Sequence, residues 1–411
     1  MIALLVPQFI HCQWNLLRYN NDQQSIMALA DTNNLVAITS GSARFHYSSN
    51  QGKTWSSFQS QFEYSWFSDA HFPSDNVGYA CGGTAFGNYS NVIVKTTDKG
   101  QTWDSVSANQ FWQTGSMTLH KLHFFNNDTG MLAGEVGLFL RTFDGGVTFE
   151  KVDSTVSRNV NEIHFTEKGK VFIGVQKVLP TAEVRYTIEL SNDFGNTWQT
   201  VYSDTMSNTN GIDHRTINKI QMVNAVVGYA VGGNGLFLKT EDGGKSWAKK
   251  ILQPETNLTA LSFISTEVGF INNAGGIHIT YDGGVNWQAQ KVFPLDIIYQ
   301  IEALNERVAY AFGTDGIYKL TDIGQPNSNG LENETNNEAI KIFPNPVHDK
   351  LFLTGEMSRD IKISILNLNG QVVQQESQAS SEIDVSALSA GPYTLLLNDD
   401  SGAKKLSFIK Q

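Results

Sequence analysis

Cysteine, arginine and long apolar runs are scarce in this chain of 411 residues. It holds two cysteines and eight arginines, its formal net charge is −11, and 17% of its residues are charged. This acidic balance excludes general nucleic-acid binding, because phosphate contacts need a basic surface. No run reaches the roughly 18 apolar residues of a membrane helix, so no transmembrane segment is predicted. Glycine and phenylalanine are abundant, with 36 and 24 copies, which favours a turn-rich all-β fold.

Residues 1–12 resemble the end of a secretory signal peptide. An apolar run from Ile2 to Ile10 precedes the small residue Cys12. The basic segment that normally opens a signal peptide is missing, so we expect the true start to lie upstream. Two alternatives stay open, namely an ordinary N-terminal β-strand and a lipoprotein acylated at Cys12, although His11 is unusual before such a cysteine. Cleavage after Cys12 would leave Cys81 alone and exclude an internal disulfide.

A short motif, Asp-x-Gly-x-(Thr/Ser)-Trp, recurs along the chain. Its copies read SSNQGKTW, TTDKGQTW, TFDGGVTF, SNDFGNTW, TEDGGKSW and TYDGGVNW. A seventh copy, LTDIG, matches the motif only in part. Their acidic or Asn positions are separated by 48, 46, 49, 49, 40 and 40 residues, and they are Asn50, Asp98, Asp144, Asp193, Asp242, Asp282 and Asp322. The copies that end in tryptophan do so at Trp55, Trp103, Trp198, Trp247 and Trp287. A period of about 40 to 50 residues with alternating apolar runs is typical of four-stranded blades around an axis.

The residues of the motif suit a tight turn rather than a catalytic centre. An Asp carboxylate caps backbone N–H groups, Gly supplies positive φ, and Trp carries apolar surface into the seam between blades. We therefore predict that these residues are structural and that residues 13–324 form a seven-bladed β-propeller. The last repeat supplies three strands only, so Gln13–Asn20 is predicted to add the fourth strand and close the ring.

This motif resembles the Asp-box, or BNR, repeat of sialidases, sortilin-type receptors and xyloglucanases. The run VGYAVGGNG at residues 227–235 is similar to that of photosystem II assembly factors and their relatives in non-photosynthetic bacteria. The resemblance implies a propeller, but a propeller is a scaffold for many activities.

The C-terminal part has a different pattern. Residues 325–339 are polar and without periodicity, as expected of a linker. Residues 340–411 contain several short β runs, and Asn369–Gly370 indicates a hairpin, so a small immunoglobulin-like β-sandwich is predicted. The segment resembles the type A C-terminal sorting domain of type IX secretion, and the matching positions include Pro344, Asn345, Pro346, Gly370, Asp384, Gly391 and Tyr393. The resemblance implies recognition by the outer-membrane translocon of Bacteroidetes; an ordinary carbohydrate-binding sandwich is the alternative.

Catalytic and metal motifs are mostly missing. Sialidases need three arginines around a substrate carboxylate, and the arginine content here is too low to favour that activity. His120 and His123 are three residues apart, which on a regular strand would place them on opposite faces and prevent shared metal binding. Cys81 aligns with apolar strand residues and is predicted to be buried. No catalytic residue, metal or cofactor is therefore predicted.

The repeats differ mainly in loops at the end opposite the motif turns. These loops are rich in aromatic and polar residues, which are typical of recognition surfaces. The predicted ligand-binding residues are Tyr64, Trp66, Phe86, Tyr89, Phe111, Trp112, His214 and Arg215. In the alternative interpretation these rings only cover the ends of neighbouring blades.

The combined prediction is an exported protein, secreted or held at the outer-membrane surface of a Gram-negative bacterium. Its predicted task is to bind a glycan or another protein. Two other functions stay open: a glycoside hydrolase that uses carboxylates across the pore mouth, and an extracytoplasmic helper for assembly or folding of a partner.

Overall fold

The structure of the chain is a computed structural model. It describes residues 13–19, 25–39, 44–59, 65–84, 91–106, 119–134, 137–152, 158–167, 169–178, 184–205, 216–273, 276–292, 297–305, 308–314, 316–321, 341–343, 347, 349–354, 362–367, 371–376, 382–389, 391–399 and 402–410. The regular elements assigned in these ranges are β-strands, which confirms the all-β prediction. Within these same residues, no helix meets the length and hydropathy needed to span a membrane. The chain divides into two compact units, Met1–Pro326 and Asn327–Gln411.

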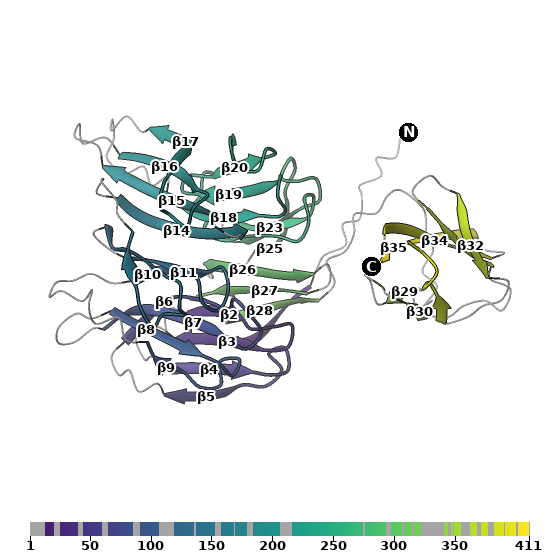
Figure 1. The fold of residues 1–411 in the computed structure, drawn as a ribbon, viewed down its shortest axis with the longest axis horizontal. Helices are drawn as coiled ribbons and strands as arrows, with labels where there is room; N and C mark the ends of the chain where they lie inside the picture. Colours follow the sequence, from purple (N-terminus) through teal and green to yellow (C-terminus); the bar gives the residue numbers. More distant parts are fainter. Residues whose placement is uncertain are drawn as a thin grey trace, which may run out of the picture. The chain divides into compact units, whose positions relative to one another are not determined.

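The first unit consists of four-stranded antiparallel sheets, each built from consecutive strands except for one (Figure 1). The first two sheets contain β2 (Ser25–Leu29), β3 (Leu35–Thr39), β4 (Arg44–Ser48) and β5 (Ser56–Gln59), then β6 (Ser65–His71), β7 (Gly78–Thr84), β8 (Asn91–Thr96) and β9 (Asp104–Ser105). The next two contain β10 (Leu119–Phe124), β11 (Gly130–Gly134), β12 (Phe139–Thr142) and β13 (Glu150–Lys151), then β14 (Arg158–Glu167), β15 (Lys170–Val178), β16 (Val184–Ser191) and β17 (Gln199–Thr205). Two further sheets contain β18 (Ile217–Met222), β19 (Gly228–Gly232), β20 (Leu236–Thr240) and β21 (Ala248–Ile251), then β22 (Leu261–Phe263), β23 (Gly269–Asn273), β24 (Gly276–Thr280) and β25 (Gln288–Val292).

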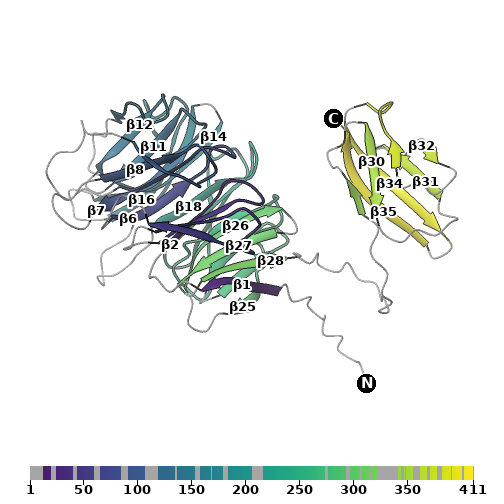
Figure 2. The ribbon, with the colours of Figure 1, turned by 90° about the horizontal axis from the view of Figure 1, so that it is seen from below.

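The remaining sheet of this unit joins the two ends of the unit. It contains β26 (Ile298–Asn305), β27 (Val308–Gly313), β28 (Gly316–Thr321) and, beside β28, the N-terminal strand β1 (Gln13–Tyr19). Figure 2 shows β1 alongside β28, and the antiparallel register runs from Gln13 opposite Thr321 to Tyr19 opposite Gly316. The predicted closure by the N-terminal strand is therefore confirmed.

The core of the first unit lies in the seams between neighbouring sheets. The second strands β11, β19 and β23 are buried at every residue, because a sheet covers each of their faces. The aromatic residue of each motif turn packs into such a seam. Trp103, for example, lies 5.2 Å from Phe45 of the preceding sheet, between ring centroids. Cys81 is fully buried among apolar residues, as predicted.

The first strand of each sheet contacts the first strands of its neighbours, so these strands surround the centre of the unit. Most of them carry a register shift near the start, for example between Ile217 and Lys219 of β18. At this point the paired strand comes very close, and a Cβ on Gly232 would lie 1.9 Å from the carbonyl oxygen of Thr216. This backbone contact at the shift explains why a glycine occupies position 232.

The second unit contains two antiparallel sheets. One consists of β29 (Lys341–Phe343), β30 (Lys350–Thr354) and β33 (Glu382–Asp384), and the other of β32 (Val372–Glu376), β31 (Lys362–Leu366), β34 (Gly391–Asp399) and β35 (Gly402–Lys410), in these spatial orders. Both sheets contribute to one core that includes Leu351, Ile363 and Leu395. Strands β31 and β32 form the hairpin predicted from Asn369–Gly370, a pair that itself falls outside the described residues.

Candidate functional site

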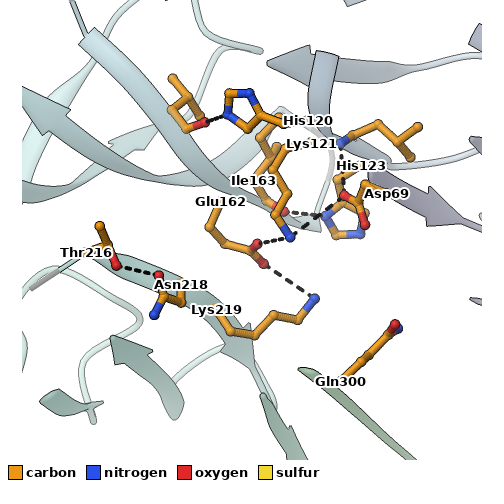
Figure 3. A network of polar contacts seen from close by, with 12 residues as sticks. Asp69, His120, Lys121, His123, Glu162, Ile163, Thr216, Asn218, Lys219 and Gln300 are labelled. Atoms are coloured by element: carbon orange, nitrogen blue, oxygen red, sulfur yellow. Dashed lines mark hydrogen bonds and ion pairs between the residues drawn. The ribbon is translucent and has the colours of Figure 1, made fainter. Parts of the chain in front are cut away.

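The centre of the first unit is lined by side chains from equivalent positions of successive first strands. Directly after the register shift come Asp69 of β6, Lys121 of β10, Glu162 of β14, Lys219 of β18 and Gln300 of β26. Because the shift lies at the same place in each strand, these side chains come together on the inside of the ring. Figure 3 shows Lys121 between Asp69 and Glu162, with Lys219 on the other side of Glu162.

Four of these residues form a continuous chain of opposite charges. Lys121 Nζ lies 3.9 Å from Asp69 Oδ2 and 3.2 Å from Glu162 Oε2, and Lys219 Nζ lies 3.5 Å from Glu162 Oε1. The Glu162 side chain is 3% exposed, whereas Lys121 and Lys219 keep 25% and 34% of theirs accessible. The two lysine side chains are therefore partly accessible to solvent although strands surround them.

The carboxylates keep both ammonium groups charged. Glu162 raises the pKa of Lys219, against the effect of burial. Burial lowers the pKa of Lys121, but Asp69 and Glu162 more than offset this and raise it above its ordinary value. The carboxylates of Asp69 and Glu162 therefore both face a charged lysine. These ion pairs connect the first strands β6, β10, β14 and β18 across the centre.

Two residues farther along the same strands, histidines bridge neighbouring first strands. The Nδ1 atom of His71 accepts a hydrogen bond from the Phe124 N–H at 3.3 Å, and Nδ1 of His123 is 3.1 Å from the Phe165 nitrogen. The Nε2 atom of His164 accepts from the Met222 N–H at 3.0 Å. Strands β6, β10, β14 and β18 are thus connected by imidazoles.

Uncharged side chains make the same connection in the following sheets. Gln221 Oε1 accepts from the Phe263 N–H at 2.7 Å, and Ser262 Oγ accepts from the Ala303 N–H at 2.9 Å. Two residues earlier in the pattern, at the position of Lys121 and Lys219, Gln300 Oε1 accepts from the Met27 N–H at 3.3 Å and so connects the last sheet to the first. At the centre, neighbouring first strands are therefore generally connected by a polar side chain of one strand that contacts a backbone N–H of the next.

The expectation for His120 and His123 was wrong. Both imidazoles reach the same neighbouring strand, because His120 Nε2 lies 2.8 Å from the Val160 oxygen and His123 Nδ1 lies 3.0 Å from the Ile163 oxygen of β14. The register shift between Leu119 and Lys121 interrupts the alternation that the prediction assumed. No group of three or more His, Cys, Asp or Glu residues in the described ranges is arranged to hold a metal ion.

At the motif turns, each acidic side chain is occupied within its own turn. Asp98 Oδ1 accepts from the Thr102 N–H at 2.8 Å, Asp98 Oδ2 accepts from the Thr102 hydroxyl at 2.6 Å, and Thr96 Oγ1 accepts from the Gly100 N–H at 2.9 Å. The same pattern is present around Asn50, Asp144, Asp193, Asp242 and Asp282, while Asp322 lies outside the described residues. Burial raises the pKa of Asp98, but the hydrogen bonds from Thr102 lower it more. The hydroxyl and amide of Ser246 lower the pKa of Asp242 to about 2.

A hollow of about 500 Å³ lies between two of these turns. It is lined by Lys239, Glu241, Glu267, Tyr281 and Asp282, among others. The Asp282 carboxylate already accepts a hydrogen bond from the Asn286 N–H of its own turn, and Glu241 forms an ion pair with Lys239 at 2.8 Å. The acidic groups of this hollow are therefore mostly engaged.

Of the predicted ligand-binding residues, Trp66 alone lies within the described ranges. It is partly buried near the start of β6 and pairs with Gly83, whereas Thr96, which begins the motif turn, pairs with Gly78 at the other end of β7. Trp66 therefore lies at the end of the sheet away from the turn. The other predicted ligand-binding residues fall outside the described ranges, namely Tyr64, Phe86, Tyr89, Phe111, Trp112, His214 and Arg215.

In the second unit, three of the predicted sorting residues are described. Asp384 Oδ1 accepts from the Ser386 N–H at 2.9 Å, Tyr393 stacks on Phe408 with centroids 5.6 Å apart, and Gly391 has φ of 150°. Pro344, Asn345, Pro346 and Gly370 fall outside the described residues.

The central charges and histidines were missed in the sequence analysis. They are visible once the first strands are aligned at the register shift, where the segments read FSDAH, LHKLH, VNEIH, INKIQ, LTALS and IYQIE. The third and fifth letters are polar in nearly every copy, although a buried strand would favour apolar residues there. This repeated polarity was the available signal.

Two parts of the chain match known family models. Residues 149–316 match the family model of the photosynthesis system II assembly factor YCF48, and residues 341–411 match that of the secretion system C-terminal sorting domain. The curated photosystem II assembly protein Ycf48 of Thermosynechococcus vestitus is 23% identical over 196 residues, which are 46% of this chain and 51% of the relative. The chain thus spans about half the length of that curated relative.

Two solved structures share the fold of the first unit. YCF48 bound to D1 peptide has a TM-score of 0.56 and 14% identity, and the match covers 77% of this chain and 98% of the other. YCF48 from Cyanidioschyzon merolae has a TM-score of 0.51 and 13% identity, covering 75% and 98%. The chain therefore joins a YCF48-like propeller with BNR repeats to a type IX secretion sorting domain, and that domain directs it to the cell surface or the extracellular space.

Proposed function

We propose that this protein is an exported, seven-bladed propeller that binds a segment of another protein at the rim opposite the motif turns. In this proposal residues 13–324 are the propeller, 325–339 a linker, and 340–411 an immunoglobulin-like sorting domain handled by the type IX translocon. Residues 1–12 are the remnant of the signal peptide.

The sheet arrangement supports this blade number and the sandwich. Each four-stranded sheet of the first unit fits one repeat of the motif, and β1 completes the sheet of the last repeat. In the second unit, two antiparallel sheets share one apolar core, as in an immunoglobulin-like fold.

The observation that carries the proposed ligand is the likeness, over 77% of this chain, to YCF48 bound to D1 peptide. Two features of this chain agree with recognition at the opposite rim. The described acidic groups of the motif turns are held within their own turns, and the central carboxylates face lysines. Binding at the rim is also consistent with an aromatic residue, Trp66, at that end of β6.

Alanine substitutions in the full chain test this function. Trp66→Ala and Trp112→Ala are compared with Phe143→Ala, which removes a ring that is 46% exposed next to a motif turn. Peptide arrays, glycan arrays and pull-downs from culture supernatants are the readouts. We expect peptide binding that falls at least about tenfold with the two rim variants and stays unchanged with Phe143→Ala.

Three results would contradict the proposal. Binding to glycans but not to peptides would show that the ligand is a carbohydrate. An equal loss of peptide binding with Phe143→Ala would show that the site lies at the motif turns. Turnover of a polysaccharide would favour the hydrolase.

A further inference from the structure

The connections between the first strands differ in one chemical respect. At the equivalent position of five successive strands, a side chain approaches or accepts from a backbone N–H of the next strand: His71, His123, His164, Gln221 and Ser262. Three of these are imidazoles, whereas the amide of Gln221 and the hydroxyl of Ser262 do not titrate in the physiological range. Three consecutive seams therefore depend on groups that can change their charge.

A neutral imidazole has one nitrogen that accepts, but a protonated imidazole only donates. Protonation of His71 or His164 would place an N–H group against the N–H of Phe124 or Met222, so the hydrogen bond would be lost. His123 is in a different position, because its Nδ1 lies close both to the Phe165 nitrogen and to the Ile163 oxygen. Its protonated form would keep the contact with the oxygen and give up the contact with the nitrogen.

The surroundings of the three rings oppose protonation. The rings of His71 and His123 have centroids 4.2 Å apart, and those of His123 and His164 are 5.4 Å apart, so one charge would lie beside the next. Besides one another, the charged groups that act on these rings are Lys121 and Lys219. The titratable groups near these two lysines are Asp69, Cys81, Glu162 and Glu302. The two lysines add repulsion, and the carboxylates are already engaged by these lysines.

The pKa directions agree with this geometry. Burial, together with His123 and Lys219, lowers the pKa of His71 well below its ordinary value. Burial and the neighbouring cations do the same for His123, with the Ile163 carbonyl opposing. Burial and Lys219 lower the pKa of His164 to about 3.

We infer that His71, His123 and His164 make one side of the ring acid-sensitive. Protonation of His71 and His164 removes the hydrogen bonds that join β6 to β10 and β14 to β18, and protonation of His123 weakens the connection between β10 and β14, while the seams bridged by Gln221 and Ser262 stay closed. The inference concerns the ring itself and does not depend on what the protein binds.

The sign of the effect follows from linkage. A histidine whose pKa is lower in the folded than in the unfolded protein contributes stability that is complete above about pH 6.5 and is lost as the pH falls below it. Each such group changes the unfolding equilibrium constant by up to about tenfold per pH unit, so three groups give up to about a thousandfold.

The test replaces all three histidines by glutamine in the full chain, because Gln221 shows that glutamine can hold the next strand at this position. Unfolding in urea is followed between pH 7.5 and 5 by tryptophan fluorescence. All eight tryptophans precede residue 327, so the signal reports on the first unit. Each histidine is already half protonated in the unfolded protein at about pH 6.5. We therefore expect the unfolding constant of the unmodified protein to rise by up to roughly 170-fold between pH 6.5 and 5.5, and that of the triple variant by less than about tenfold.

His120→Gln is the matched control, because His120 lies on β10 as well but its Nε2 contacts the carbonyl oxygen of Val160 and not a backbone N–H. This variant should keep the pH dependence of the unmodified protein. Equal pH dependence of the unmodified and triple-variant proteins would overturn the inference. Should the triple variant fail to fold, NMR titration of the histidine side chains decides instead, and pKa values of 6.5 or above for all three rings would overturn it as well.

Discussion

Lys319 donates a hydrogen bond from Nζ to Oε1 of Gln51, 2.6 Å away and separated from it by 268 residues of sequence. The same ammonium lies 5.6 Å from the centre of the Tyr310 ring. An equivalent arrangement occurs between consecutive sheets, where Lys95 lies over Tyr79 and donates to the Gly145 oxygen of the next turn at 3.2 Å. The last and first sheets are therefore joined by a lysine contact of the same kind as the one from β8 to the next motif turn.

Removing the closing strand should open the ring. Trp14 of β1 is 3% exposed and packs edge-on against Phe270, so Trp14→Ala is expected to reduce the free energy of unfolding by about 3 to 5 kcal/mol. Deletion of residues 13–20 should lower the melting temperature strongly. Circular dichroism during urea and thermal denaturation measures both effects, with the partly buried Trp66→Ala as a milder control. An unchanged melting curve after the deletion would refute closure by β1.

The motif turn should tolerate asparagine better than alanine. Asp98→Ala removes the acceptor for the Thr102 N–H and hydroxyl and is expected to lower the free energy of unfolding by about 1 to 2 kcal/mol. Asp98→Asn should be close to neutral, because Asn50 makes the equivalent contacts with Thr54 in the first turn. Denaturation at pH 7 distinguishes the two, and equal losses would contradict this account of the turn.

Acid should destabilise the unmodified protein more than the Asp98→Asn variant. Because the hydrogen bonds from Thr102 hold the pKa of Asp98 below its ordinary value of 3.8, its contribution is complete above that value and is lost as the pH falls further. Asp98→Asn should therefore lose less stability than the unmodified protein below pH 4. A greater loss in the variant would show that the carboxylate is not stabilised in the folded state.

Substitutions in the central row of ion pairs should have effects that do not add up. Glu162→Gln leaves Lys121 and Lys219 without their shared carboxylate, and we expect a loss of about 2 to 3 kcal/mol in the free energy of unfolding. In the double variant Glu162→Gln with Lys121→Gln, one unpaired cation is removed, so the loss should be smaller than the sum of the two single losses. Additive losses in urea denaturation would argue against a coupled chain.

Export should depend on the second unit. A protein that lacks residues 341–411 is expected to be missing from the cell surface and the medium and to remain inside the cell, because the sorting domain directs export. Immunoblots of cell fractions measure this. Surface location of the shortened protein at normal amounts would contradict the role of this domain.

The repeated turn and the strand order could be predicted because their determinants are local or periodic. Asp98, Gly100 and Thr102 make their contacts within one turn, and the spacing of such turns reveals the unit. Closure by Gln13–Tyr19 followed from counting strands, since a three-stranded last unit needs a partner.

The central site was harder to predict for two physical reasons. Asp69, Lys121 and Glu162 lie far apart in the sequence and pair only after the sheets are placed side by side. In addition, a register shift changes which residues face inward, and this led to the wrong faces for His120 and His123. A period of two residues describes a regular strand, but the first strands are irregular at the very point where their polar side chains turn to the centre.

The position of β1 sets an order on the maturation of this polypeptide. Its Gln13 is among the first of the paired residues to leave the ribosome, and the partner Thr321 follows only after every other sheet of the unit has been translated. Until then β1 lacks its partner strand, and an unpaired strand edge favours association with other molecules. Closure is consequently the last step, and truncated translation products that lack β28 would leave β1 unpaired.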